Sequence, residues 1–282
     1  MKQQIKITFT LVLLLFLSFL LTTPAQTLNL IHDKTFDVQP GQLLEVQTDV
    51  GDIKLRTWDQ NKVHIKVYGD RDAEEEMDFY FEKTSNGVLI DAEKESGFSG
   101  WFGGIRVKYE IDVPKNFNLD MKTAGGDLLV VDLNGTVKLK TSGGDIICDN
   151  ITGEFNASTS GGDIELTKID GNISVSTSGG DVEIRSANGK VNASTSGGDI
   201  TLDYEGENKG IDLHTSGGDI TVHIPDDFKA ELYLRTSGGS IRCSAETRVS
   251  ESGKYKFIGT MNGGGPELNA KTSGGDVTVD TY

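Results

Sequence analysis

Cysteine, proline and histidine are rare in this chain of 282 residues, which contains two, five and four of them respectively. Two cysteines cannot form the multi-bridge framework that stabilises small disulfide-rich domains. The four histidines are scattered, and no pair has the spacing of a zinc site. The sequence also lacks a Gly-x-Ser-x-Gly elbow, a phosphate-binding loop and a dinucleotide fingerprint. These absences predict a protein without catalytic residues, metal ligands or cofactors.

Basic residues are also fewer than acidic residues. The 27 Lys and Arg residues are outnumbered by 43 Asp and Glu residues, and the formal net charge is −16. Nucleic acids and anionic membrane surfaces attract proteins through clusters of basic residues. The charge balance therefore argues against nucleic acid as a partner and against binding to an anionic membrane.

Long apolar runs are confined to the beginning of the sequence. Residues 7–21 are apolar apart from Thr and Ser, Lys2 and Lys6 precede them, and Thr-Pro-Ala follows at 23–25. This is the layout of a secretory signal peptide, and the run is short for a membrane span. We expect residues 1–25 to be a signal peptide cleaved near Ala25, the alternative being an uncleaved anchor. No cysteine follows the run, so a bacterial lipid anchor is not expected. The mature chain is then predicted in the periplasm, at the cell surface or secreted, without stable insertion into a membrane.

Glycine is abundant, with 35 residues, and much of it belongs to a repeated phrase, Thr-Ser-Gly-Gly-Asp. Successive copies begin 18 residues apart four times, and then 20, 21 and 36 residues apart. We interpret the last step as two periods whose middle copy has decayed. A period near twenty residues is shorter than a helical hairpin and predicts stacked β rungs, that is, a β-solenoid. The copies begin at Thr123 (with Ala124 in place of Ser), Thr141, Thr159, Thr177, Thr195, Thr215, Thr236 (with Ser240 in place of Asp) and Thr272.

Apolar residues recur within each repeat at positions 6, 8, 11, 15 and 17, when the Thr is position 1. Side chains two apart on a strand point to the same side, so positions 6 and 8 face inward from one strand, and 15, 17 and the following Thr from another. The Gly pair at positions 3 and 4 and the Gly at position 13 mark corners, where Gly reaches positive φ without a Cβ clash. We predict an all-β, parallel β-helix-like solenoid of about 18–21 residues per rung with two main strands per rung. One rung has the inward residues Ile146, Cys148, Ile151, Phe155 and Ala157.

The two cysteines occupy the same position of different rungs. Cys148 and Cys243 both fall at position 8, and their rungs are five apart in sequence order. With rungs about 4.8 Å apart, the two residues are separated by about 24 Å, whereas a disulfide requires Cα atoms within about 7 Å. We expect two buried free thiols that replace Leu or Val in the core.

The phrase is fainter between residues 26 and 115. Thr-Asp-Val-Gly-Asp at 48–52 is similar to it and Trp58 falls at position 11, so residues 44–58 are expected to form an early rung. Alternating apolar runs follow at 63–67, 77–81, 88–90 and 105–113, and Asn86-Gly87 between two of them predicts an antiparallel hairpin. We divide the chain into a signal peptide (1–25), an N-terminal β region that continues or caps the solenoid (26–115), and the repeat solenoid (116–282).

The last copy of the phrase is cut short. Residues 272–282 begin a rung and end after its first strand, which predicts an unpaired edge at the C-terminal end of the solenoid. Such an edge could dock a partner strand or allow self-association, and the alternative is that Tyr282 and its neighbours close it.

One loop is rich in aromatic residues. Residues 96–104 carry Phe98, Trp101 and Phe102 on a glycine-rich backbone. Trp101 and Phe102 either fold back over apolar rung surface or form an exposed contact for a partner or a glycan, and the sequence leaves both open.

The Asp at position 5 forms a column of carboxylates in successive rungs. Carboxylates about 4.8 Å apart repel by about 0.9 kcal/mol in water, so each must be solvated, hydrogen-bonded or bridged by a cation. We expect each Asp to close its own Gly-Gly corner by accepting backbone N–H bonds, and the alternative is a row of calcium sites. The Thr residues are expected to pack and to hydrogen-bond to one another. The column comprises Asp127, Asp145, Asp163, Asp181, Asp199 and Asp219.

A catalytic alternative rests on one surface cluster. Glu165 and Glu183 occupy outward position 7, near Lys168 and Arg185, and carboxylates beside a basic residue suit the chemistry of polysaccharide lyases and hydrolases. In later rungs position 7 is occupied by Thr, and the repeats contain no long loops that could form the walls of a cleft. Of the four histidines, His214 and His223 fall at outward or corner positions of the repeats and are expected at the surface.

Three features resemble a known family. Val107–Pro114 (Val-Lys-Tyr-Glu-Ile-Asp-Val-Pro), residues 119–127 (Leu-Asp-Met-Lys-Thr-Ala-Gly-Gly-Asp) and the repeated phrase resemble the bacterial putative-adhesin β-strand-repeat family of exported domains of unknown function. The resemblance extends from Asp33 to Tyr282 and implies a β-helix-like solenoid at the cell envelope, with no catalytic residues to carry over.

The function expected from the sequence is therefore a non-catalytic, adhesin-like binding surface or scaffold. Its partner would be an envelope protein or a glycan. One alternative is a calcium-assisted polysaccharide lyase or hydrolase on a β-helix, and another is a structural envelope accessory with protein partners.

Overall fold

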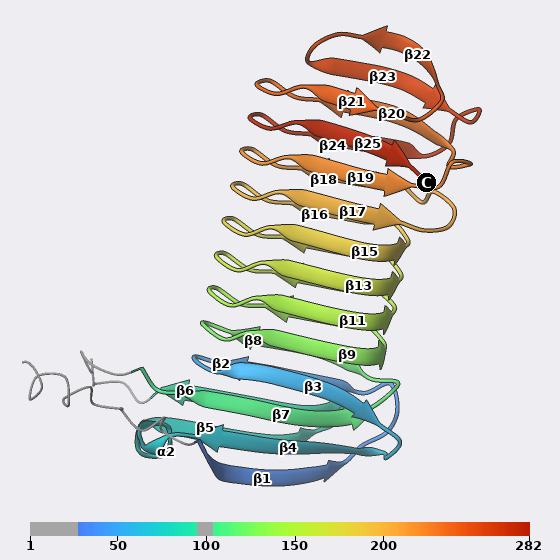
Figure 1. Ribbon diagram of the computed structural model, residues 1–282. Coiled ribbons are helices and arrows are strands. Elements are labelled where there is room, and N and C mark those ends of the chain that lie inside the picture. Colours follow the sequence, from blue (N-terminus) through green and yellow to red (C-terminus); the bar gives the residue numbers. More distant parts are fainter. Residues whose placement is uncertain (1–27, 95–103) are drawn as a thin grey trace, which may run out of the picture.

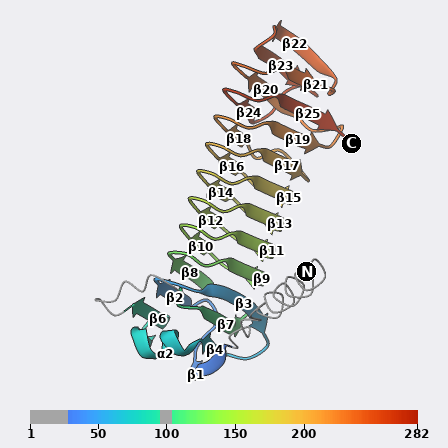
Figure 2. The ribbon, with the colours of Figure 1, turned by 60° about the vertical axis from the view of Figure 1, so that its left-hand side comes forward.

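The structure, a computed structural model, describes residues 28–94 and 104–282. Nearly all of its regular structure is β, and the strands stack into a tall pile of rungs formed by two facing sheets (Figure 1 and Figure 2). The predicted signal peptide, as well as Phe98, Trp101 and Phe102, lies outside the described residues.

The two sheets are called sheet A, with 12 strands, and sheet B, with 13. In spatial order, sheet A consists of β1 (Asn29–Asp37), β4 (Lys62–Gly69), β7 (Val107–Pro114), β3 (Asp52–Trp58), β9 (Leu128–Asn134), β11 (Ile146–Thr152), β13 (Ile164–Asp170), β15 (Val182–Asn188), β17 (Ile200–Tyr204), β19 (Ile220–Ile224), β25 (Val277–Thr281) and β21 (Ile241–Cys243). From the same end, sheet B consists of β5 (Met77–Thr84), β6 (Gly87–Lys94), β2 (Leu43–Thr48), β8 (Asn118–Thr123), β10 (Val137–Lys140), β12 (Phe155–Ser158), β14 (Ile173–Ser176), β16 (Val191–Ser194), β18 (Ile211–His214), β24 (Glu267–Lys271), β20 (Ala230–Arg235), β23 (Lys256–Met261) and β22 (Thr247–Ser252).

Each repeat is one rung, with one strand in each sheet, and the rungs pair in parallel and in register. Ile146 of β11 lies opposite Ile164 of β13, and Phe155 of β12 lies opposite Ile173 of β14. The apolar residues at positions 6, 8, 11, 15 and 17 of these rungs are buried, and they join the N-terminal strands in one continuous core. The predicted all-β solenoid is confirmed, and removal of these apolar columns from water is what stabilises the stack.

A left-handed residue at position 10 explains why the inward positions run 6, 8 and 11. The ladder between β11 and β13 skips this residue and resumes at Ile151 and Ile169. One residue with positive φ reverses the inward-outward alternation, so the next apolar side chain again faces the core. The residues at position 10 are Asp132 (φ 61°), Asn150 (φ 59°), Lys168 (φ 54°) and Ser186 (φ 56°).

The corner glycines serve two different purposes. The glycine at position 13 has positive φ, for example 152° at Gly171, as predicted. The expectation of positive φ in the Gly-Gly pair is wrong, because neither Gly143 nor Gly144 adopts it. Gly144 is instead required by close stacking, since a Cβ there would overlap the carbonyl oxygen of Gly126 in the preceding rung, while Gly143 has open space around it.

The N-terminal region adds antiparallel strands to the same two sheets. The predicted early rung is present as β2 and β3, and the predicted hairpin at Asn86-Gly87 joins β5 and β6. Strands β1 and β4 extend sheet A in antiparallel fashion, and a short helix, α2 (Arg71–Glu76), begins at the N-cap Asp70. The β2–β3 rung lies between the β6–β7 rung and the β8–β9 rung, so these later segments enclose it.

The C-terminal end has a chain order that the sequence did not predict. After β19 the chain leaves one rung vacant, forms β20 and β21, and turns through the β22–β23 hairpin. It then returns, so that β24 and β25 lie between the β18–β19 rung and the β20–β21 rung. The 36-residue step is thus a detour through a hairpin, and the interpretation as a decayed copy is wrong.

The predicted unpaired edge at residues 272–282 is wrong for the same reason. Strand β25 pairs with β19 on one side and β21 on the other, so the last residues lie inside sheet A. The edges at this end are β21 and β22 (Figure 1). Tyr282 does not close an edge; its hydroxyl donates a hydrogen bond to the carbonyl of Tyr204 at 3.0 Å.

Because the chain returns in this way, the two cysteines are farther apart than the sequence predicts. Sheet A contains β13, β15, β17, β19 and β25 between β11 and β21, so Cys148 and Cys243 are six rungs apart, about 29 Å, and not five. Both thiols are free, as predicted. Only Cys148 is buried, however, because Cys243 lies on a three-residue edge strand and is half-buried.

We expect a thiol reagent to modify Cys243 in the native protein and Cys148 only after unfolding. The thiolate is the reactive form, and burial raises the pKa of both thiols. The effect is greater at Cys148, which is 1% exposed and has no route to solvent without opening of the rungs. Timed alkylation followed by mass spectrometry of the peptides measures both rates, and equal rates would contradict the placement of β25 and β21.

Candidate binding surfaces

The Thr-Ser-Gly-Gly-Asp corners are held together by hydrogen bonds between rungs. The Thr141 hydroxyl donates to the Gly126 carbonyl at 2.9 Å and accepts from the Gly144 N–H at 3.3 Å. The expected bonds from one Thr hydroxyl to the next are absent from the repeat corners, because each hydroxyl faces a glycine carbonyl of the neighbouring rung. The same pair of bonds is made by Thr159, Thr177, Thr195, Thr215, Thr236 and Thr272.

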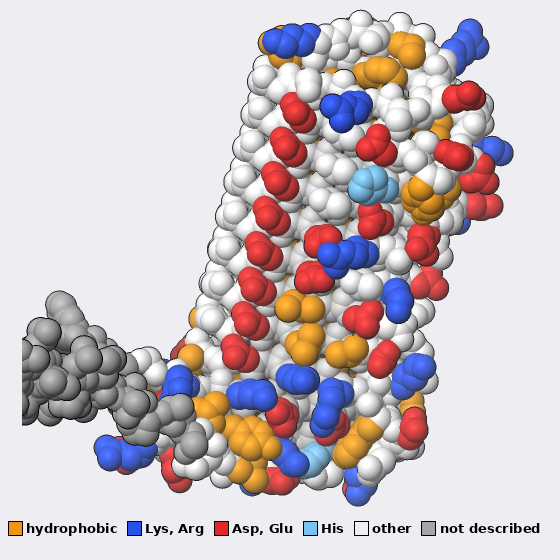
Figure 3. Space-filling model, in the orientation of Figure 1, with side chains coloured by type: hydrophobic (Ala, Val, Ile, Leu, Met, Phe, Trp, Pro, Cys, Tyr) orange, Lys and Arg blue, Asp and Glu red, His pale blue; other side chains and the backbone are white. Residues whose placement is uncertain are grey.

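The Asp column links the rungs in the same direction. The backbone N–H of Asp145 donates to Oδ1 of Asp127 at 2.8 Å, and that of Asp163 donates to Oδ1 of Asp145 at 2.8 Å. The expectation that each Asp closes its own corner is therefore wrong, since N–H groups of stacked parallel strands point along the stack toward the next rung. The column forms an acidic ridge along one edge of the molecule (Figure 3). The acidic ridge consists of Asp52, Asp127, Asp145, Asp163, Asp181, Asp199, Asp219 and Asp276.

The acidic ridge contributes to the stacking of the rungs. Neighbouring carboxylates about 4.8 Å apart repel by about 3.5 kcal/mol at an effective dielectric constant of 20, and charge-assisted bonds from the backbone N–H groups offset part of this. One oxygen of each of these carboxylates is occupied in this way up to Asp276, which accepts from Ser240 at 2.7 Å. Across residues 28–94 and 104–282, no group of three or more His, Cys, Asp or Glu residues is arranged to hold a metal ion.

The outer face of sheet A carries the charged cluster considered for catalysis. Arg185 contacts Glu165 at 2.7 Å and Glu183 at 2.5 Å, so the structure brings these three residues together. The hydrogen bond to Glu165 and the charge of Glu183 raise the pKa of Arg185, which remains a cation shared between two carboxylates. Lys168 lies apart from them at the left-handed position of its rung, and all three members of the cluster are substantially exposed.

The histidines of the repeats lie at the surface. On the same face of sheet A, His223 Nδ1 lies 2.6 Å from Asp203 Oδ1, and both side chains are about two-fifths exposed. His214 is exposed on the opposite face, at the end of β18 in sheet B. The two residues are therefore on different faces of the solenoid and do not form one site.

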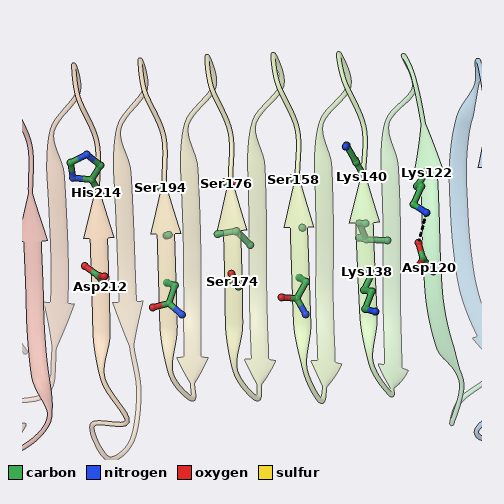
Figure 4. Close-up of a pocket in the computed structure, with 16 residues that line it drawn as sticks. Asp120, Lys122, Lys138, Lys140, Ser158, Ser174, Ser176, Ser194, Asp212 and His214 are labelled. Atoms are coloured by element: carbon green, nitrogen blue, oxygen red, sulfur yellow. Dashed lines mark ion pairs between the residues drawn. The ribbon is translucent and has the colours of Figure 1, made fainter.

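The outer face of sheet B is hollowed into an open groove of about 660 Å³. Strands β12, β14 and β16 present only Ser and Asn side chains there, while the longer Lys138 and Lys140 of β10 and His214 of β18 lie on either side of them (Figure 4). The hollow arises because short side chains in three successive rungs lie between these longer ones. The polar residues lining the groove are Asp120, Lys122, Lys138, Lys140, Asn156, Ser158, Ser174, Ser176, Asn192, Ser194, Asp212 and His214.

Sequence reasoning identified the ladders of polar side chains in general but not this groove. The two outward residues of the sheet B strand change from Lys-Lys in β10 to Asn-Ser, Ser-Ser and Asn-Ser, and then to Asp-His in β18. A comparison of side-chain length at these two positions from rung to rung was the signal that could have located it.

Comparisons with known proteins identify a family. The family model described as Toastrack DUF4097 matches residues 42–280. No curated protein matches the chain. Among the residues that the structure describes, no helix has the length and apolar character needed to span a bilayer.

Solved structures similar to this one include proteins from three bacterial genera. A putative adhesin from Bacteroides fragilis NCTC 9343 is 14% identical with a TM-score of 0.48, and the match covers 92% of this chain and 99% of that one. A putative adhesin from Parabacteroides merdae ATCC 43184 is 13% identical with a TM-score of 0.41, over 92% and 97% of the two chains. A putative cell adhesion protein from Clostridium sporogenes ATCC 15579 is 11% identical with a TM-score of 0.32, over 89% and 99%.

Proposed function

The chain belongs to the Toastrack DUF4097 family, and from this membership and the groove on sheet B we propose that it is an exported, non-catalytic binding module of the bacterial cell envelope. Its ligand in this proposal is an extended glycan that lies in the groove. The solenoid acts as a rigid support that holds the polar side chains of the groove at fixed spacing.

The observation that carries the proposal is the repeated set of hydroxyl and amide groups on the groove floor. Ser174 and Ser176 on β14 are exposed, and the neighbouring strands present Asn and Ser at the same two positions. Such side chains both donate and accept hydrogen bonds, which matches the hydroxyls of a sugar chain. Because the backbone beneath them is fixed in a continuous sheet, binding requires little ordering of the protein.

A protein strand is a poorer occupant of the groove. Strands β12, β14 and β16 each pair with a neighbour on both sides, so their backbone N–H and C=O groups already take part in the sheet. Strand addition requires a free edge, which the groove floor does not have. Recognition there must come from side chains, which favours a hydroxyl-rich ligand over a peptide.

A second candidate function, a carbohydrate-active enzyme, has the Arg185 cluster as its only support. Glu165 and Glu183 lie on adjacent rungs, but both contact the same Arg185. One oxygen of each carboxylate is therefore occupied by the same guanidinium, and the cluster does not present a separate acid and base on either side of a substrate. The binding module therefore accounts for the surface better than a lyase or hydrolase does.

Native electrophoresis of residues 26–282 through gels containing neutral or acidic polysaccharides tests the proposal. We expect the gel to retard the protein and the polymer to keep its length, with or without calcium. Filling the groove with Ser158→Gln, Ser176→Gln and Ser194→Gln should weaken the affinity about tenfold, equivalent to about 1.4 kcal/mol. The matched control is Thr167→Gln, Thr201→Gln and Thr221→Gln, which places the same side chains on the outer face of sheet A.

Other results would contradict the proposal in separate ways. Shortened polymer would make the protein an enzyme. Equal loss of affinity in the groove variant and its control would place the binding surface elsewhere, and no retardation by any polysaccharide would leave a scaffold with protein partners.

A further inference from the structure

One row of side chains along the solenoid combines basic residues with serines. In the rungs from β8 to β20, the residue directly before the Thr of each phrase is the last outward residue of sheet B ahead of the Gly-Gly corner, and these residues stack in register. We call them the corner row, which consists of Lys122, Lys140, Ser158, Ser176, Ser194, His214, Lys271 and Arg235 in spatial order.

The corner row contains basic residues at both ends, with three serines and His214 between them, and beyond Lys122 the same register continues with Gln47 and Asp91. This arrangement stands out in a chain whose formal net charge is −16. Lys140 is accompanied by Lys138 on the same strand, and both are exposed. At the other end, Lys271 of β24 and Arg235 of β20 are exposed and lie opposite one another in the register.

Most of these cations have no acidic partner. In the described part of the chain, Lys138, Lys140 and Lys271 form no ion pair, nor does Arg235. Lys122 contacts Asp120 at 3.5 Å. The other nearby carboxylate, Asp212, accepts a hydrogen bond from Asn269 at 2.8 Å. The charges of the two basic ends are therefore available to a ligand.

We propose that the ligand is a linear acidic glycan that runs along the solenoid axis over the corner row. This inference rests on the proposed function of the groove and specifies its ligand. The anionic groups of the glycan contact the cations at the two ends, and its hydroxyls hydrogen-bond to the three serines. Lys140 and Lys271 are five rungs apart, so a chain of about 24 Å reaches both ends.

A glycan fits the corner row better than other polyanions do. Single-stranded nucleic acid is bound through aromatic side chains that stack on successive bases, and His214 is the one aromatic ring among the residues that line this groove, which contain no Trp, Tyr or Phe. An anionic membrane is a broad surface, and it would meet the acidic ridge across the Gly-Gly corner. A narrow chain can follow the row without approaching the ridge.

The combined variant Lys138→Asn and Lys140→Ser tests the inference. These substitutions give β10 the outward residues of β12, Asn156 and Ser158, so the fold should be preserved, which circular dichroism checks. We expect the affinity for polygalacturonate to fall about tenfold and to depend less on salt, while the affinity for neutral dextran stays unchanged. The matched control, Lys54→Ser with Lys66→Ser, removes two positive charges from the outer face of sheet A and should have no effect.

Chain length gives a second readout. Affinity for oligogalacturonates should rise until the chain spans about 24 Å, and Lys271→Ser should weaken the long chains more than the short ones. The protein could instead bind dextran and polygalacturonate equally, with no change in the Lys138→Asn/Lys140→Ser variant or in Lys271→Ser. This result would contradict the proposal of an acidic ligand but would be consistent with the proposed function. If oligonucleotides or anionic vesicles retard the protein, and the Lys138→Asn/Lys140→Ser variant abolishes this effect, the ligand is another polyanion and not a glycan. Absence of binding to any polysaccharide would overturn both.

Discussion

Alanine at Gly144 is expected to destabilise the solenoid by at least about 3 kcal/mol, while alanine at the adjacent Gly143 should be tolerated. A Cβ on Gly144 would overlap the carbonyl oxygen of Gly126, which is backbone and cannot rotate away. That carbonyl also accepts the Thr141 hydroxyl at 2.9 Å, so any displacement of the rung breaks this bond as well. The rungs cannot separate locally, because each is paired to its neighbours along two strands.

Gly143 provides a matched control within the same corner. Nothing lies within 4 Å of a Cβ built there, and its φ is not positive. Alanine at this site restricts the unfolded chain, so the variant should be unchanged or more stable by about 0.4–1 kcal/mol. Urea unfolding followed by circular dichroism gives both midpoints. Similar midpoints for the two variants would contradict the account of the corner as a stacking constraint.

The sequence predicts the rung well because each residue of a repeat sits in the same surroundings in every rung. Ile164 and Ile146 face inward for the same reason and lie opposite one another, so the periodicity in the sequence becomes a column in space. The function of the corner residues was harder to predict. Whether Asp145 bonds within its own rung or to the next depends on the direction of the N–H groups in three dimensions, which composition and spacing do not specify.

The order of the rungs at the ends could not be predicted for a different reason. The phrases at Thr215, Thr236 and Thr272 are nearly identical, so the phrase itself does not specify which of these rungs are neighbours. The order is decided by the hairpin β22–β23, which carries the chain past the vacant rung and back. At the N-terminal end β2–β3 is enclosed in the same way, by segments that come later in the sequence.

The groove also could not be predicted from the periodicity of the sequence alone. The residue directly before the Thr of each phrase faces outward in the repeat rungs, and the periodicity is the same whether this residue is Lys140 or Ser158. The depth and the charge of the groove depend on how its residues differ from rung to rung, whereas the repeat pattern records what the rungs have in common. The candidate site is therefore formed by residues that differ between the repeats.

Removal of residues 266–282 is expected to detach the outer end of the solenoid as well as the deleted strands. Strands β24 and β25 are the only parallel partners of β20 and β21 among the described strands, and they bury Leu268, Ala270, Val277 and Val279. Without them, the segment from Ala230 to Met261 loses its connection to the β18–β19 rung. Hydrogen exchange should therefore show loss of protection across residues 230–261 and partial loss in β18 and β19, which pair directly with the deleted strands, while residues 118–204 keep theirs. If the last copy of the phrase were simply the last rung, its removal would leave residues 230–261 protected.

A Val279→Cys substitution tests independently whether β25 lies directly beside β21, because it gives Cys243 a partner for a disulfide. Cys243 lies opposite Val279 in adjacent rungs, so the two Cα atoms are about 4.8 Å apart, within the range of a disulfide. If a decayed copy of the phrase lay between them, they would be two rungs, or about 9.6 Å, apart and could not be bridged. Cys148→Val, which copies Val130 of the preceding rung, removes the other thiol without changing the core pattern. Oxidation of the double variant should then link the peptides that contain positions 243 and 279, and absence of this link would mean that the chain does not return between the rungs.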